Sequence, residues 1–159
     1  MEKIDIVCIG TLKESYMSQL CDEYIKRLKR FCDLKVIELP ESRLAKTPGS
    51  AQIERALDTE YLRMLPYAVE GAFKIAMCIE GRSMSSQALA QSLEQCMLSQ
   101  GKAVIFIGSS YGLSQKLKDC CDLRLSMSCM TFPHQLARCM LLEQIYRSYK
   151  IRRNETYHK

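Results

Sequence analysis

Short, crowded runs of apolar residues recur along the chain, separated by longer stretches with a different spacing. Ile4, Ile6, Val7 and Ile9 form the first run, which ends at Gly10. Runs of this length, rich in β-branched residues and closed by glycine, are typical of buried strands. We predict five strands on this basis: 3–10, 34–39, 73–79, 103–107 and 121–126.

Between these runs, apolar residues recur every three or four positions, as they do on one face of a helix. In residues 14–31 the apolar stripe lies opposite a basic KRLKR run. A Ser85 or Ser86 cap and a stop at Gly101 delimit a later helix. The remaining predicted helices are 51–65, a short one from Ser114, and 133–149. Residues 40–50 are polar, with two prolines and a glycine, and favour irregular structure.

The alternation of strands and helices predicts an α/β layered fold with a mostly parallel sheet in one domain, residues 1–159. Ligands of such folds bind beyond the carboxyl ends of the strands. Gly10, Gly81, Gly108 and the loop 126–132 follow these ends, so we expect them to converge on one crevice.

Composition narrows the class of protein. The chain has 159 residues, of which 47% are hydrophobic, and no apolar run approaches the roughly 20 residues of a membrane span. Its start, MEKIDIVCIG, does not resemble a signal peptide, so a cytoplasmic location without membrane contact is expected. The nine cysteines include no C-x-x-C pair, and two histidines provide no zinc framework. Reduced, mostly buried thiols and no metal site are expected.

The net charge of +5 suits an acidic partner such as RNA, although many other proteins carry the same charge. Its placement is more informative. Residues 147–159 contain five basic residues and a histidine but only one acid, Glu155. This segment is either a disordered basic end or an ordered functional tail, and the pair Tyr157-His158 favours the second interpretation.

Two loops have alternative explanations. The run Gly108-Ser-Ser-Tyr-Gly112 is neither a G-x-G-x-x-G fingerprint nor a P-loop. It is a tight turn, or it allows a ligand to approach the backbone closely. The loop 126–132 offers hydroxyls and amides without strong charge, which suits a neutral or zwitterionic ligand. Alternatively, it precedes the last helix with Thr131 as the cap and Pro133 in the first turn.

The last helix is apolar around more than half of its circumference, which indicates that a second copy of the chain covers it. Arg138 lies off its polar face and is a candidate for a site or an interface, or it pairs with a local carboxylate. His134 in the first turn is a capping residue or part of a site.

The segments FPHQLAR, EQIYR and the terminal YHK resemble the ribosomal large-subunit RNA methyltransferase H family, small members of the SPOUT class. The resemblance extends over the whole chain. It implies an α/β SPOUT fold with a trefoil knot, a homodimer, and S-adenosylmethionine as methyl donor. The implied reaction is methylation of N3 of a pseudouridine in 23S ribosomal RNA on the assembled ribosome.

The resemblance also implies site residues. The family's cofactor positions fall on Met77, Gly108, Met127, Ser128, Cys129, Met130, Thr131 and Phe132. We expect catalysis from Arg138, Tyr157 and His158, and RNA contacts from His134, Arg147, Arg152, Arg153 and Lys159.

The chain departs from the family pattern at three places: Ser109 stands for a second glycine, Met77-Cys78 for Leu and an acid, and Thr156 for a proline. None of these departures removes a side chain to which a catalytic role is assigned. Serine can replace glycine at position 109 if the φ angle there is negative. Two alternative functions remain: a SPOUT-type methyltransferase acting on another RNA, and an RNA-binding module without catalysis. A generic nucleotide-binding protein is a weaker third, because no phosphate motif is present.

Overall fold

The computed structural model describes residues 1–157 and contains one five-stranded sheet. The strands are β1 (Glu2–Ile9), β2 (Cys32–Leu39), β3 (Phe73–Ser83), β4 (Lys102–Ile107) and β5 (Leu123–Ser126). Their order is β2-β1-β4-β3-β5, and every neighbouring pair is parallel. The predicted parallel α/β sheet is therefore confirmed.

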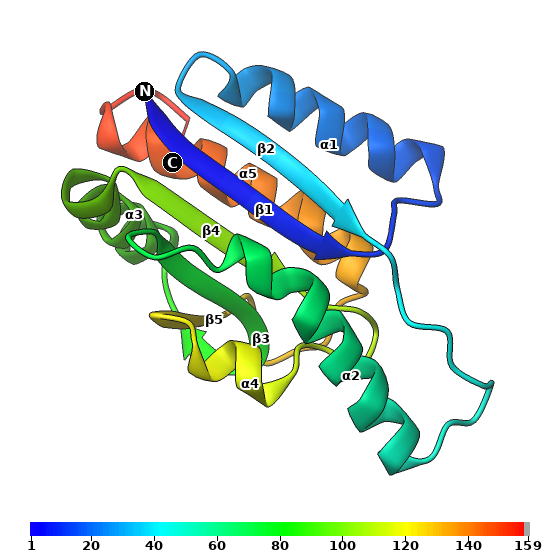
Figure 1. Ribbon diagram of the computed structural model, residues 1–159. Coiled ribbons are helices and arrows are strands. Elements are labelled where there is room, and N and C mark those ends of the chain that lie inside the picture. Colours follow the sequence, from blue (N-terminus) through cyan, green and yellow to red (C-terminus); the bar gives the residue numbers. More distant parts are fainter. Residues whose placement is uncertain (158–159) are drawn as a thin grey trace.

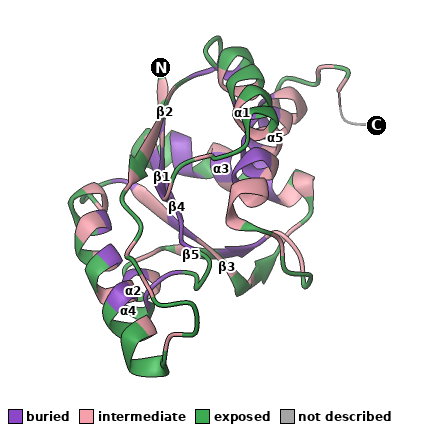
Figure 2. Ribbon diagram, turned by 90° about the vertical axis from the view of Figure 1, so that its right-hand side faces the viewer, coloured by how far each residue is buried: buried purple, intermediate pink, exposed green. Residues whose placement is uncertain are grey.

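Helices cover both faces of the sheet (Figures 1 and 2). Their bounds are α1 (Ser15–Leu28), α2 (Ser50–Met64), α3 (Ser86–Gln100), α4 (Gln115–Asp119) and α5 (His134–Arg152), with a 3-10 turn at Leu65–Tyr67. α1, α5 and α3 lie side by side on one face, whereas α2 and α4 lie on the other. No helix within residues 1–157 is both long and apolar enough to cross a membrane.

The alternation of side chains along the strands divides the core into two layers. Ile4, Ile6 and Cys8 of β1 pack toward α1, α3 and α5, whereas Val7 and Ile9 pack toward α2 and α4. A strand in a sheet that is covered on both faces must be apolar on both sides. This requirement explains the continuous apolar runs from which the strands were predicted.

Local signals set the ends of α3 as predicted. The Ser85 side chain accepts a hydrogen bond from the backbone N–H of Ala88, and Gly101 ends the helix with a φ of 69°. β3, by contrast, continues to Ser83, four residues beyond its predicted end. Its pairing with β5 is interrupted by an irregularity between Met77 and Arg82 and then resumes.

This extension corrects the expected position of Gly81, which lies within β3 rather than after its carboxyl end. A Cβ atom at Gly81 would lie 2.8 Å from the Arg124 carbonyl oxygen, so glycine permits the close approach of β5. The predicted cap is also corrected. Pro133 occupies the N-cap position of α5, and Thr131 precedes it without capping the helix.

α5 lies in the groove between α1 and α3 (Figure 1). Its apolar residues Leu141, Leu142 and Ile145 are buried by the sheet and these two helices of the same chain. Much of the apolar circumference of α5 is therefore buried within one chain, whereas Leu136, Ala137 and Met140 remain only half-buried.

Candidate functional site

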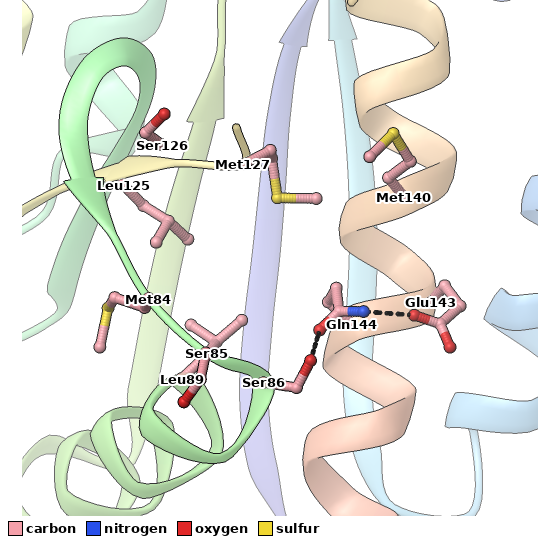
Figure 3. A pocket seen from close by; sticks show the side chains of 10 residues that line it. All are labelled: Met84, Ser85, Ser86, Leu89, Leu125, Ser126, Met127, Met140, Glu143 and Gln144. Carbon is pink, nitrogen blue, oxygen red and sulfur yellow. Dashed lines mark hydrogen bonds between the residues drawn. The ribbon is translucent and has the colours of Figure 1, made fainter. Parts of the chain in front are cut away.

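A cavity of about 340 Å³ opens between the end of β5, the start of α3 and the middle of α5 (Figure 3). Apolar side chains line much of it, with serine hydroxyls, an amide and a carboxylate at its edge. The lining residues are Met84, Ser85, Ser86, Leu89, Leu125, Ser126, Met127, Met140, Glu143 and Gln144. A mixed cavity of this size suits a small organic ligand with a few polar groups.

A chain of hydrogen bonds crosses the cavity from α3 to α5 (Figure 3). The Ser86 hydroxyl donates to Gln144 Oε1 at 2.7 Å, and Gln144 Nε2 donates to Glu143 Oε2 at 2.7 Å. Glu143 Oε1 also accepts from Arg147 Nη2 at 2.6 Å and from the Tyr157 hydroxyl at 3.1 Å. Glu143 therefore connects the cavity to the C-terminal tail.

The Ser126–Phe132 segment is folded by its own hydrogen bonds. Ser126 Oγ donates to the Ser128 carbonyl at 3.0 Å, and Ser128 Oγ accepts from the Met130 amide at 3.0 Å. Among the eight predicted cofactor positions, Met127 lines the cavity and the other seven do not. Cys129, Met130 and Thr131 are exposed, so their side chains remain accessible to a ligand or a second molecule.

Met77 in β3 and Gly108, just after the neighbouring strand β4, lie near the same edge of the sheet. Met77 pairs with Leu125 in β5, and Gly108 directly follows β4. A Cβ atom at Gly108 would be 2.2 Å from the Gly112 carbonyl oxygen. The tight turn thus explains the glycine at position 108. The Ser109 φ is not positive, since Asn154 alone has a positive φ among the non-glycine residues of the described chain.

A buried carboxyl supports this turn from α2. Glu60 is 4% exposed, and its Oε1 accepts a hydrogen bond from the Ser42 amide at 3.0 Å. Burial raises the pKa of Glu60, and hydrogen bonds from Ser42 and Ser109 oppose that effect. Glu60 could not be predicted as a site residue, because its helical position in the sequence shows nothing of the loop that folds over it.

Arg138 is buried on the face of α5 that packs toward β2. Its Nη1 forms an ion pair with Glu38 of β2, and its Nη2 donates to the Gly10 carbonyl at 3.0 Å. Its Nε atom is buried without a hydrogen-bond partner. A second cavity, of about 360 Å³ between α1, β2 and α5, is lined in part by Arg138 and Glu38. The carboxylate partner that was left open as an alternative is therefore present.

His134 lies close to Arg138 at the first turn of α5. Its Nε2 is 3.8 Å from the position of a Cβ atom at Gly10. Burial lowers the pKa of His134, and the Glu41 carboxylate only partly opposes this. His134 is therefore neutral at pH 7, and it does not present a fixed positive charge to a phosphate.

The described part of the tail folds back onto α5. The Tyr157 ring packs edge-on against Tyr146 at 5.0 Å between centroids, and the Arg147 guanidinium lies 4.8 Å from the Tyr157 ring. Burial, followed by the neighbouring Tyr24 and Glu143, raises the pKa of Tyr157. Its hydroxyl therefore remains protonated at neutral pH and acts as a hydrogen-bond donor. His158 and Lys159 lie outside the described residues.

The basic residues of the tail have different surroundings. Arg152 forms a two-point ion pair with Glu2, at 2.7 and 2.9 Å, and contacts Glu94 at 3.4 Å. This geometry favours a structural role, since it ties the end of α5 to the start of β1. Arg153 is exposed, with its guanidinium 4.6 Å from the Phe31 ring.

The predicted catalytic residues are not all brought together within the chain. Arg138 faces β2 and the Gly10 turn, whereas Tyr157 contacts Glu143, on a different side of α5. All nine cysteines are free, and five of them are buried, as expected. Residues 1–157 contain no group of three or more His, Cys, Asp or Glu side chains suited to a metal ion.

Comparisons with known proteins connect this geometry to a family. The family model described as "Predicted SPOUT methyltransferase" matches residues 2–158. The chain is 40% identical, over 99% of both chains, to "Ribosomal RNA large subunit methyltransferase H" of Ruminiclostridium cellulolyticum. It is 41% identical to "Ribosomal RNA large subunit methyltransferase H 1" of Clostridium perfringens, over 98% of this chain and 99% of that protein. A "Putative ribosomal RNA large subunit methyltransferase H" of Methanococcus maripaludis is 38% identical, with the same coverage.

Proposed function

This chain belongs to the SPOUT methyltransferase family, and on that premise we propose that it methylates ribosomal RNA of the large subunit. The observation that carries the proposal is the similarity over nearly the whole chain to relatives named for that activity. We propose S-adenosylmethionine as the methyl donor and N3 of a pseudouridine in 23S ribosomal RNA, on the assembled ribosome, as the acceptor. A trefoil knot, a homodimer and a cytoplasmic location belong to the same proposal.

The cavity beside Met127 fits such a donor in size and chemistry. Its thioether and aliphatic side chains suit the adenine ring and the carbon chain, while Ser126, Ser85 and Gln144 offer hydrogen-bonding groups for the polar ends. S-adenosylmethionine, when bound, supplies a methyl group on a positively charged sulfur. The residues Met77, Gly108 and Met127–Phe132, at or near the same edge of the sheet, would bind it.

Methyl transfer of this kind is an in-line displacement, so the protein contributes mainly by orienting the acceptor and excluding water. N3 of a pseudouridine is a weak acid, and it must lose its proton to attack. We propose that Tyr157 and His158 position and deprotonate the base. Because the raised pKa of Tyr157 keeps its hydroxyl protonated, Tyr157 would exchange its hydrogen bond to Glu143 for one to the base, and proton removal would fall to His158.

Arg138 has a positioning role in this proposal. Its hydrogen bond to the Gly10 carbonyl and its ion pair with Glu38 hold the turn after β1 against the end of β2. Arg147, Arg153 and Lys159 are proposed to contact phosphates, together with His134 through neutral hydrogen bonding. Arg152 has most of its donors occupied by Glu2, so its proposed contribution to RNA binding is indirect.

Mass spectrometry of ribosomal RNA tests the proposal most directly. Cells that lack this protein are expected to lose one methylpseudouridine from 23S ribosomal RNA and to recover it when the gene is restored. An unchanged modification pattern would contradict the proposed target. Transfer of labelled methyl groups to free ribosomal RNA or transfer RNA, but not to ribosomes, would support a different RNA substrate.

Calorimetry with S-adenosylmethionine separates an enzyme from an RNA-binding module. We expect saturable binding, which a chain truncated after Arg153 retains while it loses methyl transfer. Turnover by the truncated chain would contradict the role of the tail. Mixed dimers identify the subunit that supplies the tail. One subunit is truncated and keeps its cofactor site, and the other carries a Gly108 substitution and keeps its tail. Activity returns only if the tail of one subunit crosses to the cofactor site of its partner.

A further inference from the structure

The C-terminal ends of α1 and α5 lie together at the edge of the sheet opposite the cavity, beside the N-terminus of the chain (Figure 1). Four cations gather there: Lys26, Lys29 and Arg30 from the end of α1, and Arg153 from the end of α5. We call these four residues the basic surface. It lies one length of α5 from the Gly10 turn, which is about 28 Å for 19 residues at 1.5 Å each.

The cations of the basic surface lack the partners that neutralise their neighbours. Arg27 pairs with Glu23, Lys150 with Glu155, and Arg152 with Glu2. Within residues 1–157, no carboxylate lies within ion-pair distance of any member of the basic surface. Glu155 is close enough to interact electrostatically with Arg30 and Arg153, but its carboxylate is bound by Lys150. The basic surface therefore retains most of its positive charge.

Two of these cations are held in place by an aromatic ring. The guanidinium groups of Arg30 and Arg153 lie 4.7 and 4.6 Å from the centroid of the Phe31 ring. The ring itself is fixed by stacking on Tyr149, at 5.2 Å and an interplanar angle of 13°. Two like charges beside one ring repel each other, and an anion that bridges them removes that cost. Fixed, planar guanidinium groups are suited to binding phosphate oxygens.

The protein surface is also hollowed next to these residues. A depression of about 400 Å³ is lined by Met1, Lys3, Lys29, Cys32, Asp33 and Leu34. Lys29 of the basic surface and one further lysine, Lys3, bring two ammonium groups to its wall, against the single carboxylate of Asp33. Charge without a counter-ion, fixed guanidinium groups and a hollow therefore occur together.

We propose that the basic surface binds the phosphate backbone of the RNA substrate, beyond the contacts that the tail makes with the target nucleotide. This inference rests on the proposed function for the identity of the RNA. A substrate that contacts both the tail and the basic surface must extend along the protein surface beyond the target nucleotide. The basic surface would thus add affinity that depends on the RNA around the target.

Binding and turnover are measured with large ribosomal subunits that lack the modification, using the full-length chain. The test variant is Lys29→Gln/Arg30→Gln. Its matched control is Lys116→Gln/Arg124→Gln, which removes the same charge from two exposed residues away from α1 and α5. We expect the test variant to raise KM and the dissociation constant at least tenfold at physiological salt, with kcat within twofold of the wild type.

Salt dependence provides the decisive reading. Each lost phosphate contact reduces the slope of log affinity against log salt by about 0.7 to 0.9, so two contacts reduce it by about 1.4 to 1.8. A test variant with the slope and the KM of the control would overturn the proposal. Weaker binding with an unchanged slope would also overturn it, since it would indicate a contact with a ribosomal protein.

A second variant controls for the possibility that Lys29→Gln/Arg30→Gln disturbs folding. Lys26→Gln/Lys29→Gln removes two cations that contact no aromatic ring in the described chain, and it is expected to weaken binding and reduce the slope in the same way. Direct binding to subunits also separates this proposal from the proposed function. If the wild type binds ribosomal subunits but transfers no methyl group, the proposed enzymatic function is wrong, and the binding measurements still test the basic surface.

Discussion

The ion pair between Arg138 and Glu38 is strongly asymmetric, and this asymmetry leads to a quantitative prediction. The Arg138 side chain is 3% exposed, whereas the Glu38 side chain is 38% exposed. Removing the carboxylate by Glu38→Met leaves a buried guanidinium with the Gly10 carbonyl as its remaining acceptor. Breaking a buried ion pair in this way costs about 3 to 5 kcal/mol.

The reverse change is expected to cost less. In Arg138→Met, the Glu38 carboxylate regains water, and the main loss is the hydrogen bond to Gly10, about 1 to 2 kcal/mol. The double variant Glu38→Met/Arg138→Met should resemble Arg138→Met alone, because no buried charge is left without a partner. The expected coupling between the two positions is therefore about 2 kcal/mol or more.

Thermal and urea unfolding, followed by circular dichroism at one protein concentration, measure these differences. For a chain of this length, 1 kcal/mol corresponds to about 2 to 4 °C in Tm, so Glu38→Met should lower Tm by roughly 6 to 20 °C. Glu23→Met is a matched control at an exposed pair, 43% and 50% exposed, and should cost under about 1 kcal/mol. The reasoning is refuted if Arg138→Met destabilises as much as Glu38→Met, or if the two changes are additive.

Three further predictions concern the turns and the histidine at the site. Gly108→Ala forces a Cβ atom toward the Gly112 carbonyl and should destabilise by about 3 kcal/mol in urea unfolding, whereas Gly49→Ala, with nothing within 4 Å, should be neutral. Asn154 has a φ of 50°, so Asn154→Gly should preserve the tail turn, whereas Asn154→Val should cost about 1 to 2 kcal/mol of stability. Trypsin should therefore cleave the tail of the valine variant faster than that of the wild type, and equal cleavage rates would contradict this prediction. Because the folded pKa of His134 is lowered, its contribution to stability is complete above the unfolded pKa of about 6.5 and is lost as pH falls below it. The His134→Gln variant should not lose this stability between pH 7 and 5. If its stability falls with pH as much as that of the wild type, the loss does not come from His134.

The elements that rest on local signals were predicted closely. Ser85 and Gly101 set the ends of α3 through a side-chain cap and a left-handed backbone, and both are visible in the sequence. The continuation of β3 to Ser83 was not visible, because it depends on renewed pairing with β5 after an irregularity. The edge at which the candidate cavity lies follows from strand order, since the carboxyl ends of parallel strands meet at one edge.

The lining of the cavity required the folded chain. Ser86, Glu143 and Gln144 come from two helices, and their hydrogen-bond chain exists only because α5 packs beside α3. A sequence pattern also cannot distinguish a solvated Glu143 from one that accepts a hydrogen bond from Tyr157.

The sequence by itself determined the parallel α/β fold, the edge of the sheet at which a site is expected, and the family resemblance, because each depends on periodicity or on contiguous motifs. Tertiary structure alone decided the surroundings of individual side chains in the C-terminal third. It buried Arg138 against Glu38, 100 positions away, tied Arg152 to Glu2, and left Arg153 beside Phe31 with its charge available. The physical reason is that an arginine's role depends on the distance to a carboxylate and on its exposure to water, and residues far apart in the sequence set both.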